Sequence, residues 1–224
     1  MIDHKKELLL AGGHMTMGGE LYQYLAELAE PEGKIGFIEF ASTDPVRAAE
    51  KLKMTEEFFA SKGIDVVNIT SIDDCYGLGV IHMHGGNPQK LVSEMESSGI
   101  AELLRPAWKY GDVVLGGSSA GAMSLFWEML VDKDHRITSD LMKGIGPMGG
   151  GFIIPHYDII DSDLIGEIVE KHADRLIIGI DENTTLRWRK GVCDVIGAGK
   201  VTLLGRSSGV FGPGEEFDLA STKQ

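Results

Sequence analysis

The stretch Asp112-Val-Val-Leu-Gly-Gly-Ser-Ser-Ala-Gly-Ala-Met123 combines a buried-strand pattern with an abrupt helix start. Small residues surround the central serine in Gly117-Ser118-Ser119-Ala120-Gly121, so the backbone can turn sharply there. Such a turn exposes the hydroxyl of Ser119 at a helix N-terminus, where free N–H groups stabilise developing negative charge. The pattern is typical of a nucleophile elbow, although similar turns also join strands to helices in proteins without catalysis.

Short apolar runs alternate with amphipathic segments on both sides of this turn. This order is typical of an α/β fold with a mostly parallel central sheet covered by helices on both faces. Strands are expected at 7–11, 34–40, 65–69, 80–84, 112–115 and 176–180. Helices are expected at 17–29, 45–61, 87–97, 100–110, 120–131 and 162–172. Residues 132–151 are interpreted as a functional loop, and residues 184–210 as a short β-meander that closes one edge.

Length and composition restrict the class of protein. A chain of 224 residues fits one domain over residues 1–224. The formal net charge of -13 opposes binding to nucleic acid and to anionic membranes. Two distant cysteines, Cys75 and Cys193, indicate neither a disulfide framework nor zinc, which favours the cytoplasm. The apolar run at 8–11 follows a start of mixed charge and is too short for a signal peptide or a membrane span.

A second glycine turn is expected beside the elbow. Gly85, Gly86 and Asn87 directly follow the expected strand at 80–84, and the carboxyl ends of parallel strands share one edge of a sheet. Backbone N–H groups of Gly85 or Gly86, together with that of Ala120, are therefore candidates for an oxyanion hole. Asn87 and the proline after it also suit a helix start.

A nucleophilic serine needs a base and an acid that orients the base. His156 is the strongest candidate base, because it follows an apolar run and a proline beyond the elbow. Five carboxylates are candidates for the orienting acid: Glu128, Asp132, Asp134, Asp158 and Asp161. His82 and His84 alternate on one strand, but no third ligand accompanies them, so neither a metal site nor a cofactor is expected.

Several motifs along the chain resemble the dipeptidase E family of serine peptidases, whose members include aspartyl dipeptidases and cyanophycinases. They are the Gly-Gly-Asn turn at 85–87, the elbow at 117–121, the segment Pro155-His156-Tyr157, and Gly179-Ile-Asp-Glu182 before Thr184. The resemblance implies a fold like that of class I glutamine amidotransferases, with Ser119 as nucleophile and His156 as base. The family spacing implies Asp134 as the third member of the triad.

The resemblance also implies a small peptide as substrate, either an Asp-X dipeptide or a dipeptide derived from cyanophycin. The segment before His156 lacks the Gln-His pairing of cyanophycinases. A site selective for aspartate needs a cation, for which the candidates are Arg136, Lys143, Arg187 and Arg189. Asp181 and Glu182 are candidates to bind the substrate α-amine.

Two other functions are compatible with the same residues. His84-Gly85-Gly86 resembles the oxyanion motif of α/β-hydrolase esterases, and the chain order serine, aspartate, histidine also fits that class. A catalytically idle amidotransferase-like module that binds a ligand is the second alternative. The oligomeric state stays open, with a homodimer as one option.

Overall fold

The central element is an eight-stranded sheet with the order β14-β11-β10-β1-β5-β4-β2-β3. The computed structural model describes residues 6–219, so the mixed-charge start of the chain, residues 1–5, lies outside the described residues. The parallel strands are β1 (Glu7–Ala11), β2 (Lys34–Ile38), β3 (Asp65–Asn68), β4 (Val80–Met83) and β5 (Val114–Ser118). The antiparallel strands β10 (Thr184–Arg189), β11 (Val192–Gly197) and β14 (Glu216–Asp218) extend the sheet beyond β1.

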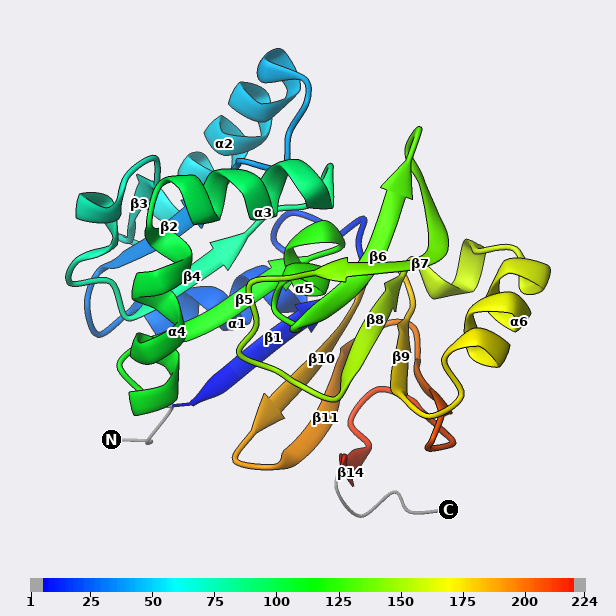
Figure 1. The fold of residues 1–224 in the computed structure, drawn as a ribbon. Coiled ribbons are helices and arrows are strands. Elements are labelled where there is room, and N and C mark those ends of the chain that lie inside the picture. The colour runs from blue at the N-terminus through cyan, green and yellow to red at the C-terminus, as the bar shows by residue number, and fades with distance from the viewer. Residues whose placement is uncertain (1–5, 220–224) are drawn as a thin grey trace.

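Helices cover both faces of this sheet (Figure 1). Side chains of α1 (Glu20–Ala29) and Phe59 of α2 (Pro45–Ala60) pack with Leu9 and Phe37 on one face. The other face packs against α3 (Pro88–Ser97), α4 (Ile100–Tyr110) and α5 (Ala120–Ser124). A 3-10 turn, η1 (Ile72–Cys75), precedes β4. The expected α/β fold class is confirmed, and the strand and helix bounds mostly lie within a few residues of the expected ones.

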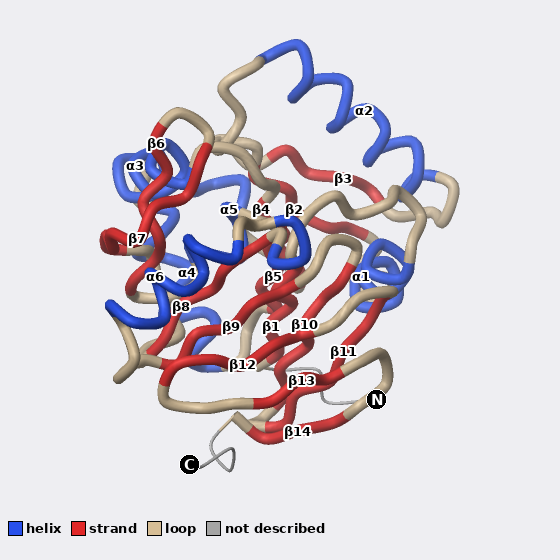
Figure 2. Tube along the Cα trace, turned by 90° about the vertical axis from the view of Figure 1, so that its right-hand side faces the viewer, coloured by secondary structure: helices blue, strands red, loops and turns tan. Residues whose placement is uncertain are grey.

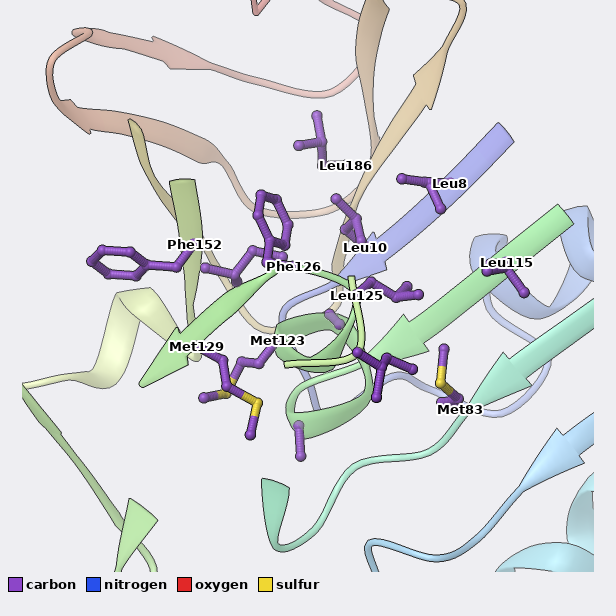
Figure 3. Packing of buried hydrophobic residues seen from close by; sticks show 14 of the residues in the cluster. Leu8, Leu10, Met83, Leu115, Met123, Leu125, Phe126, Met129, Phe152 and Leu186 are labelled. Atoms are coloured by element: carbon purple, nitrogen blue, oxygen red, sulfur yellow. The ribbon is translucent and has the colours of Figure 1, made fainter. Parts of the chain in front are cut away.

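A second sheet packs beside the first, in the order β13-β12-β9-β8. Its strands are β8 (Gly151–Pro155), β9 (Leu176–Ile180), β12 (Val201–Gly205) and β13 (Gly209–Phe211). β8 and β9 are parallel and are joined through η2 (Tyr157–Ile159) and α6 (Ser162–Lys171). Side chains from β1, β8 and the end of α5 belong to one apolar cluster, in which Leu10, Leu125 and Phe152 are fully buried (Figure 3). The tail is antiparallel as expected, but its strands are divided between the two sheets (Figure 2).

The expected helix at 120–131 is wrong beyond Ser124. Helix α5 ends there, and a hairpin of β6 (Glu128–Lys133) and β7 (Arg136–Lys143) replaces both its second half and most of the expected loop. Met129 and Leu130 of β6 are fully buried. Apolar residues at these two positions also fit the buried face of a helix, which explains the wrong expectation. The hairpin turns at Asp134 and His135, which have φ angles of 53° and 62°. Aspartate and histidine tolerate this left-handed region better than most residues, which allows the tight turn.

None of the helices between residues 6 and 219 combines the length and apolar character needed to cross a bilayer.

The close approach of α5 to the sheet yields the first prediction. A Cβ added at Gly121 would lie 2.1 Å from the carbonyl oxygen of Met83, which is backbone and cannot move freely. Gly121→Ala should therefore lower the free energy of unfolding by about 1–3 kcal/mol, as overpacked sites do. Urea unfolding measures this difference. Gly166→Ala in α6 is the matched control, because nothing lies within 4 Å of its added Cβ. The free energy of unfolding of Gly166→Ala should rise by up to about 1 kcal/mol. Equal stability of the two variants would contradict the predicted overlap at Gly121.

Candidate active site

The elbow forms as expected at the end of β5. Ser119 has φ 52° and ψ -115°, a strained conformation for a residue with a side chain. It is fixed from both sides, because its N–H donates to the carbonyl of Ala11 at 2.8 Å and its carbonyl accepts from Met123 N–H at 2.9 Å. A Cβ on Gly117 would lie 2.3 Å from the carbonyl carbon of Gly121, so only glycine permits this approach of strand to helix. This backbone conformation directs the side chain of Ser119 into a cleft, and Ser119 is one of the residues that line it.

His156 lies directly against Ser119. It follows β8, has a left-handed φ of 52°, and its N–H donates to the carbonyl of Gly12 at 3.1 Å. Its Nε2 is 3.0 Å from Ser119 Oγ. The expected pairing of these two side chains is thus present as a hydrogen bond. The ring also packs on the backbone after β1, since a Cβ on Gly13 would lie 2.1 Å from His156 Cε1.

Glu182, rather than Asp134, lies at the other side of the imidazole. Its Oε1 is 2.8 Å from His156 Nδ1. Glu182 follows β9 by two residues and His156 follows β8 by one, and these parallel neighbours pair Pro155 with Ile180. Adjacent parallel strands end at the same edge, which brings the two side chains together. Glu182 had been expected to bind an α-amine, so its position beside the imidazole was missed.

Asp134 is exposed at the tip of the β6–β7 hairpin, so the position that the resemblance implied for it beside His156 is wrong. The wrong helix at 120–131 had hidden this hairpin. The other four candidate acids make different contacts. Glu128 pairs with Arg175 at 3.0 Å, Asp132 accepts from His135 N–H, Asp158 accepts from Glu182 N–H, and Asp161 caps α6. Asp158 therefore helps to fix the backbone of Glu182 without contacting His156 directly.

The glycine turn after β4 lies beside the elbow. A Cβ on Gly85 would be 3.0 Å from Ser119 Cβ and 3.6 Å from Ser119 Oγ. Gly85, Gly86 and Ala120 all line the same cleft as Ser119 and His156. Asn87 instead caps α3, with its side chain accepting from Lys90 N–H at 2.7 Å. Asp181 is likewise engaged elsewhere, because its carboxylate accepts from Lys200 N–H at 2.8 Å.

Behind the glycine turn lies a buried polar network. His82 Nε2 is 2.9 Å from Ser118 Oγ, and His84 contacts the carboxylate of Glu39 through Nδ1 and Tyr22 Oη through Nε2 at 3.4 Å. Burial holds the pKa of both histidines well below the usual range, so both are neutral at pH 7. Burial also raises the pKa of Glu39 to about 7, against the opposing charge of Lys51. These histidines support the elbow from behind, and their contacts differ from those of a metal pair.

The cleft has a volume of about 1310 Å³ and carries charges of both signs. Arg136 lines it, whereas Lys143 pairs with Glu96 at 3.1 Å, and Arg187 and Arg189 pair with Asp194. Two cleft cations were missed from the sequence, Arg47 and Lys51 of α2. Burial lowers the pKa of Lys51. On α6 and just before it, Asp161, Asp163 and Glu167 also line the cleft.

Residues 8–196 match the sequence profile of peptidase family S51. The chain belongs to peptidase family S51. This membership makes it a hydrolase, a serine-type peptidase. It is 26% identical over 210 residues to a cyanophycinase of Geminocystis herdmanii, an alignment that covers 90% of this chain and 75% of the relative. Over 81 residues, covering 36% of this chain and 34% of the relative, it is 41% identical to the uncharacterized peptidase YgaJ of Bacillus subtilis.

The fold also matches a crystal structure of a peptidase from an acI-B1 Actinobacterium. The TM-score is 0.77 at 22% identity, with 96% of this chain and 97% of that chain covered. At this identity the likeness shows the fold alone. This fold brings three side chains together from the ends of β5, β8 and β9: Ser119, His156 and Glu182.

The arrangement predicts unequal effects for two acidic residues. Glu182→Gln should slow the labelling of Ser119 by a fluorophosphonate about 10²- to 10⁴-fold, because the amide no longer stabilises a protonated His156. Asp134→Asn is the matched control and should leave the labelling rate within about twofold, as surface changes usually do. Rates are measured by quenched labelling at several probe concentrations. A large loss in Asp134→Asn with none in Glu182→Gln would restore the assignment made from the sequence.

Proposed function

We propose that this S51 peptidase hydrolyses short peptides through an acyl-enzyme formed on Ser119. The observation that supports this most is the unbroken hydrogen-bond relay from Ser119 Oγ through His156 to Glu182, with distances of 3.0 and 2.8 Å. A relay of nucleophile, base and orienting carboxylate within hydrogen-bond reach is the general arrangement for covalent acyl transfer.

In the first step His156 Nε2 takes the proton of Ser119 while Oγ attacks the carbonyl carbon of the scissile bond. Glu182 stabilises the imidazolium that forms. His156 then returns the proton to the leaving amine, the C–N bond breaks, and the acyl group stays on Ser119. A water molecule, deprotonated by the same histidine, attacks the ester in the second step, and the serine regains its proton.

The oxyanion formed in each step is assigned to the backbone beside Ser119. The N–H groups of Ala120 and of Gly85 or Gly86 are suited to it, since these residues line the cleft at the elbow. The space that a Cβ on Gly85 would need is taken up by Ser119, so a bare backbone can approach the reacting carbonyl closely. Asn87 is assigned a supporting role, as the cap that fixes this turn at the start of α3.

We propose an acidic peptide as the substrate, with an Asp-X dipeptide as the first candidate. Arg47, Lys51 and Arg136 would bind its carboxylates as charge-assisted hydrogen-bond donors. The acidic residues that line the same cleft, Asp161, Asp163 and Glu167, would accept an α-amine or a basic second residue. Relatives named cyanophycinase make a dipeptide derived from cyanophycin the second candidate.

The two alternative functions are less well supported. In α/β-hydrolases the acid precedes the histidine in the chain, whereas here the order is Ser119, His156, Glu182. An idle module would be favoured by a triad without an orienting acid, whereas here Glu182 lies 2.8 Å from His156. We further propose that the protein acts in the cytoplasm, since both cysteines are free and buried. The homodimer stays a prediction.

Substituting the nucleophile tests the acyl-enzyme directly. Ser119→Ala should lose hydrolysis by on the order of a million-fold and should take up no fluorophosphonate, while unfolding in urea at an unchanged midpoint. Ser118→Ala is the control, because the hydroxyl of Ser118, the residue before the nucleophile, bonds His82 inside the protein. Labelling is read by intact mass and peptide mapping. Continued labelling of Ser119→Ala, or no labelling of the wild type, would refute the proposed nucleophile.

A dipeptide panel tests the substrate class. Turnover should be fastest for Asp-X among first residues Asp, Glu, Arg and Leu. Lys51→Met should raise KM for Asp-X roughly tenfold, the equivalent of one lost charge-assisted hydrogen bond. Lys143→Met is the control, because Lys143 pairs with Glu96 outside the cleft. Faster cleavage of Leu-X, or equal KM values in both variants, would exclude the proposed role of the α2 cations without affecting the nucleophile.

A further inference from the structure

A second histidine contacts the carboxylate that orients His156. His14 Nδ1 is 3.0 Å from Glu182 Oε1, the same oxygen that lies 2.8 Å from His156 Nδ1. The rings of His14 and His156 are edge-on to each other, with centroids 5.3 Å apart. One potential ligand atom from each of the three residues lies within 4.8 Å of those from the other two. The proposed relay does not use His14.

The loop after β1 fixes this second histidine in place. His14 has a left-handed φ of 46°. On one side of it the carbonyl of Gly13 accepts from Asn183 N–H at 2.9 Å. On the other side Thr16 donates both its N–H, at 3.0 Å, and its hydroxyl, at 2.9 Å, to Asn183 Oδ1. Because Asn183 is next to Glu182 in the chain, the loop carrying His14 is held beside the carboxylate.

Two imidazoles and one carboxylate are a ligand set that suits zinc. Tetrahedral Zn²⁺ binds nitrogen and oxygen at about 2.0–2.2 Å, which separates neighbouring ligand atoms by roughly 3.3 Å. The separations from Glu182 Oε1, 3.0 and 2.8 Å, require only small outward shifts. The His14 side chain is 72% exposed, so an ion can enter from solvent, and water can take the fourth position. Mg²⁺ prefers oxygen ligands and fits this set poorly.

We propose that His14, His156 and Glu182 form a binding site for Zn²⁺, and that the bound ion reversibly blocks the peptidase. Blocking rests on the function proposed for Ser119, whereas binding does not. The ion is placed on Nδ1, the nitrogen that faces Glu182. This leaves the neutral ring protonated at Nε2, where it donates to Ser119 instead of accepting its proton. Ser119 then loses its base.

Calorimetric titration of the full chain with Zn²⁺ alone tests the site itself. The wild type should bind one ion with an affinity on the order of micromolar, weaker than four-ligand structural sites. His14→Ala and Glu182→Gln should each weaken binding at least about tenfold. His135→Ala is the matched control, because His135 lines the same cleft outside the three-residue group. It should bind as the wild type does, and Mg²⁺ should give no binding heat.

Equal Zn²⁺ affinity in the wild type and His14→Ala, or no stoichiometric binding to the wild type, would overturn the zinc site. The second measurement is fluorophosphonate labelling of the wild type. Zn²⁺ should suppress it at the concentrations that saturate the site, and EDTA should restore it. Normal labelling with the site saturated would overturn the blocking. Absence of labelling without zinc would instead refute the nucleophile, and the calorimetry would still decide whether the ion binds.

Discussion

The site depends on one side chain, His156, being held between residues that come from two different sheets. Its partners are Ser119, after β5 of the large sheet, and Glu182, after β9 of the small one. The backbone after β1 also holds His156 in place. The carbonyl of Gly12 accepts a hydrogen bond from His156 N–H, and Gly13, which has no side chain, leaves space for the imidazole. The packing of the two sheets thus determines whether a base faces the nucleophile.

That packing relies on an apolar layer and on a rigid elbow. Leu10, Leu125 and Phe152 are fully buried in the apolar cluster that includes α5, the helix that follows Ser119 (Figure 3). Burial of such side chains is the main favourable term in folding, and it offsets the strain of the left-handed serine. The two histidines of the polar network behind the glycine turn are neutral, so neither adds a buried charge at the elbow.

Most of the fold could be predicted from the sequence, because parallel strands and their helices carry strong local periodicity. The elbow could be predicted because it follows a recognisable strand, and His156 because it follows an apolar run and a proline. The β6–β7 hairpin could not, because the apolar residues of Met129 and its neighbours satisfy helical and strand spacing equally well. The family spacing implied Asp134 as the acid, but the hairpin carries this residue to an exposed tip. The position of Glu182 beside His156 could not be predicted either, because it depends on the parallel pairing of β8 and β9, a long-range contact without a local signal.

The most direct test is a crystal structure of the protein after reaction with a fluorophosphonate. The account predicts phosphorus bonded to Ser119 Oγ and a phosphoryl oxygen about 2.7–3.1 Å from the N–H groups of Ala120 and of Gly85 or Gly86. It also predicts that His156 Nδ1 still bonds Glu182. Phosphorus on another residue, or an imidazole turned away from Ser119 and paired with a different carboxylate, would contradict it.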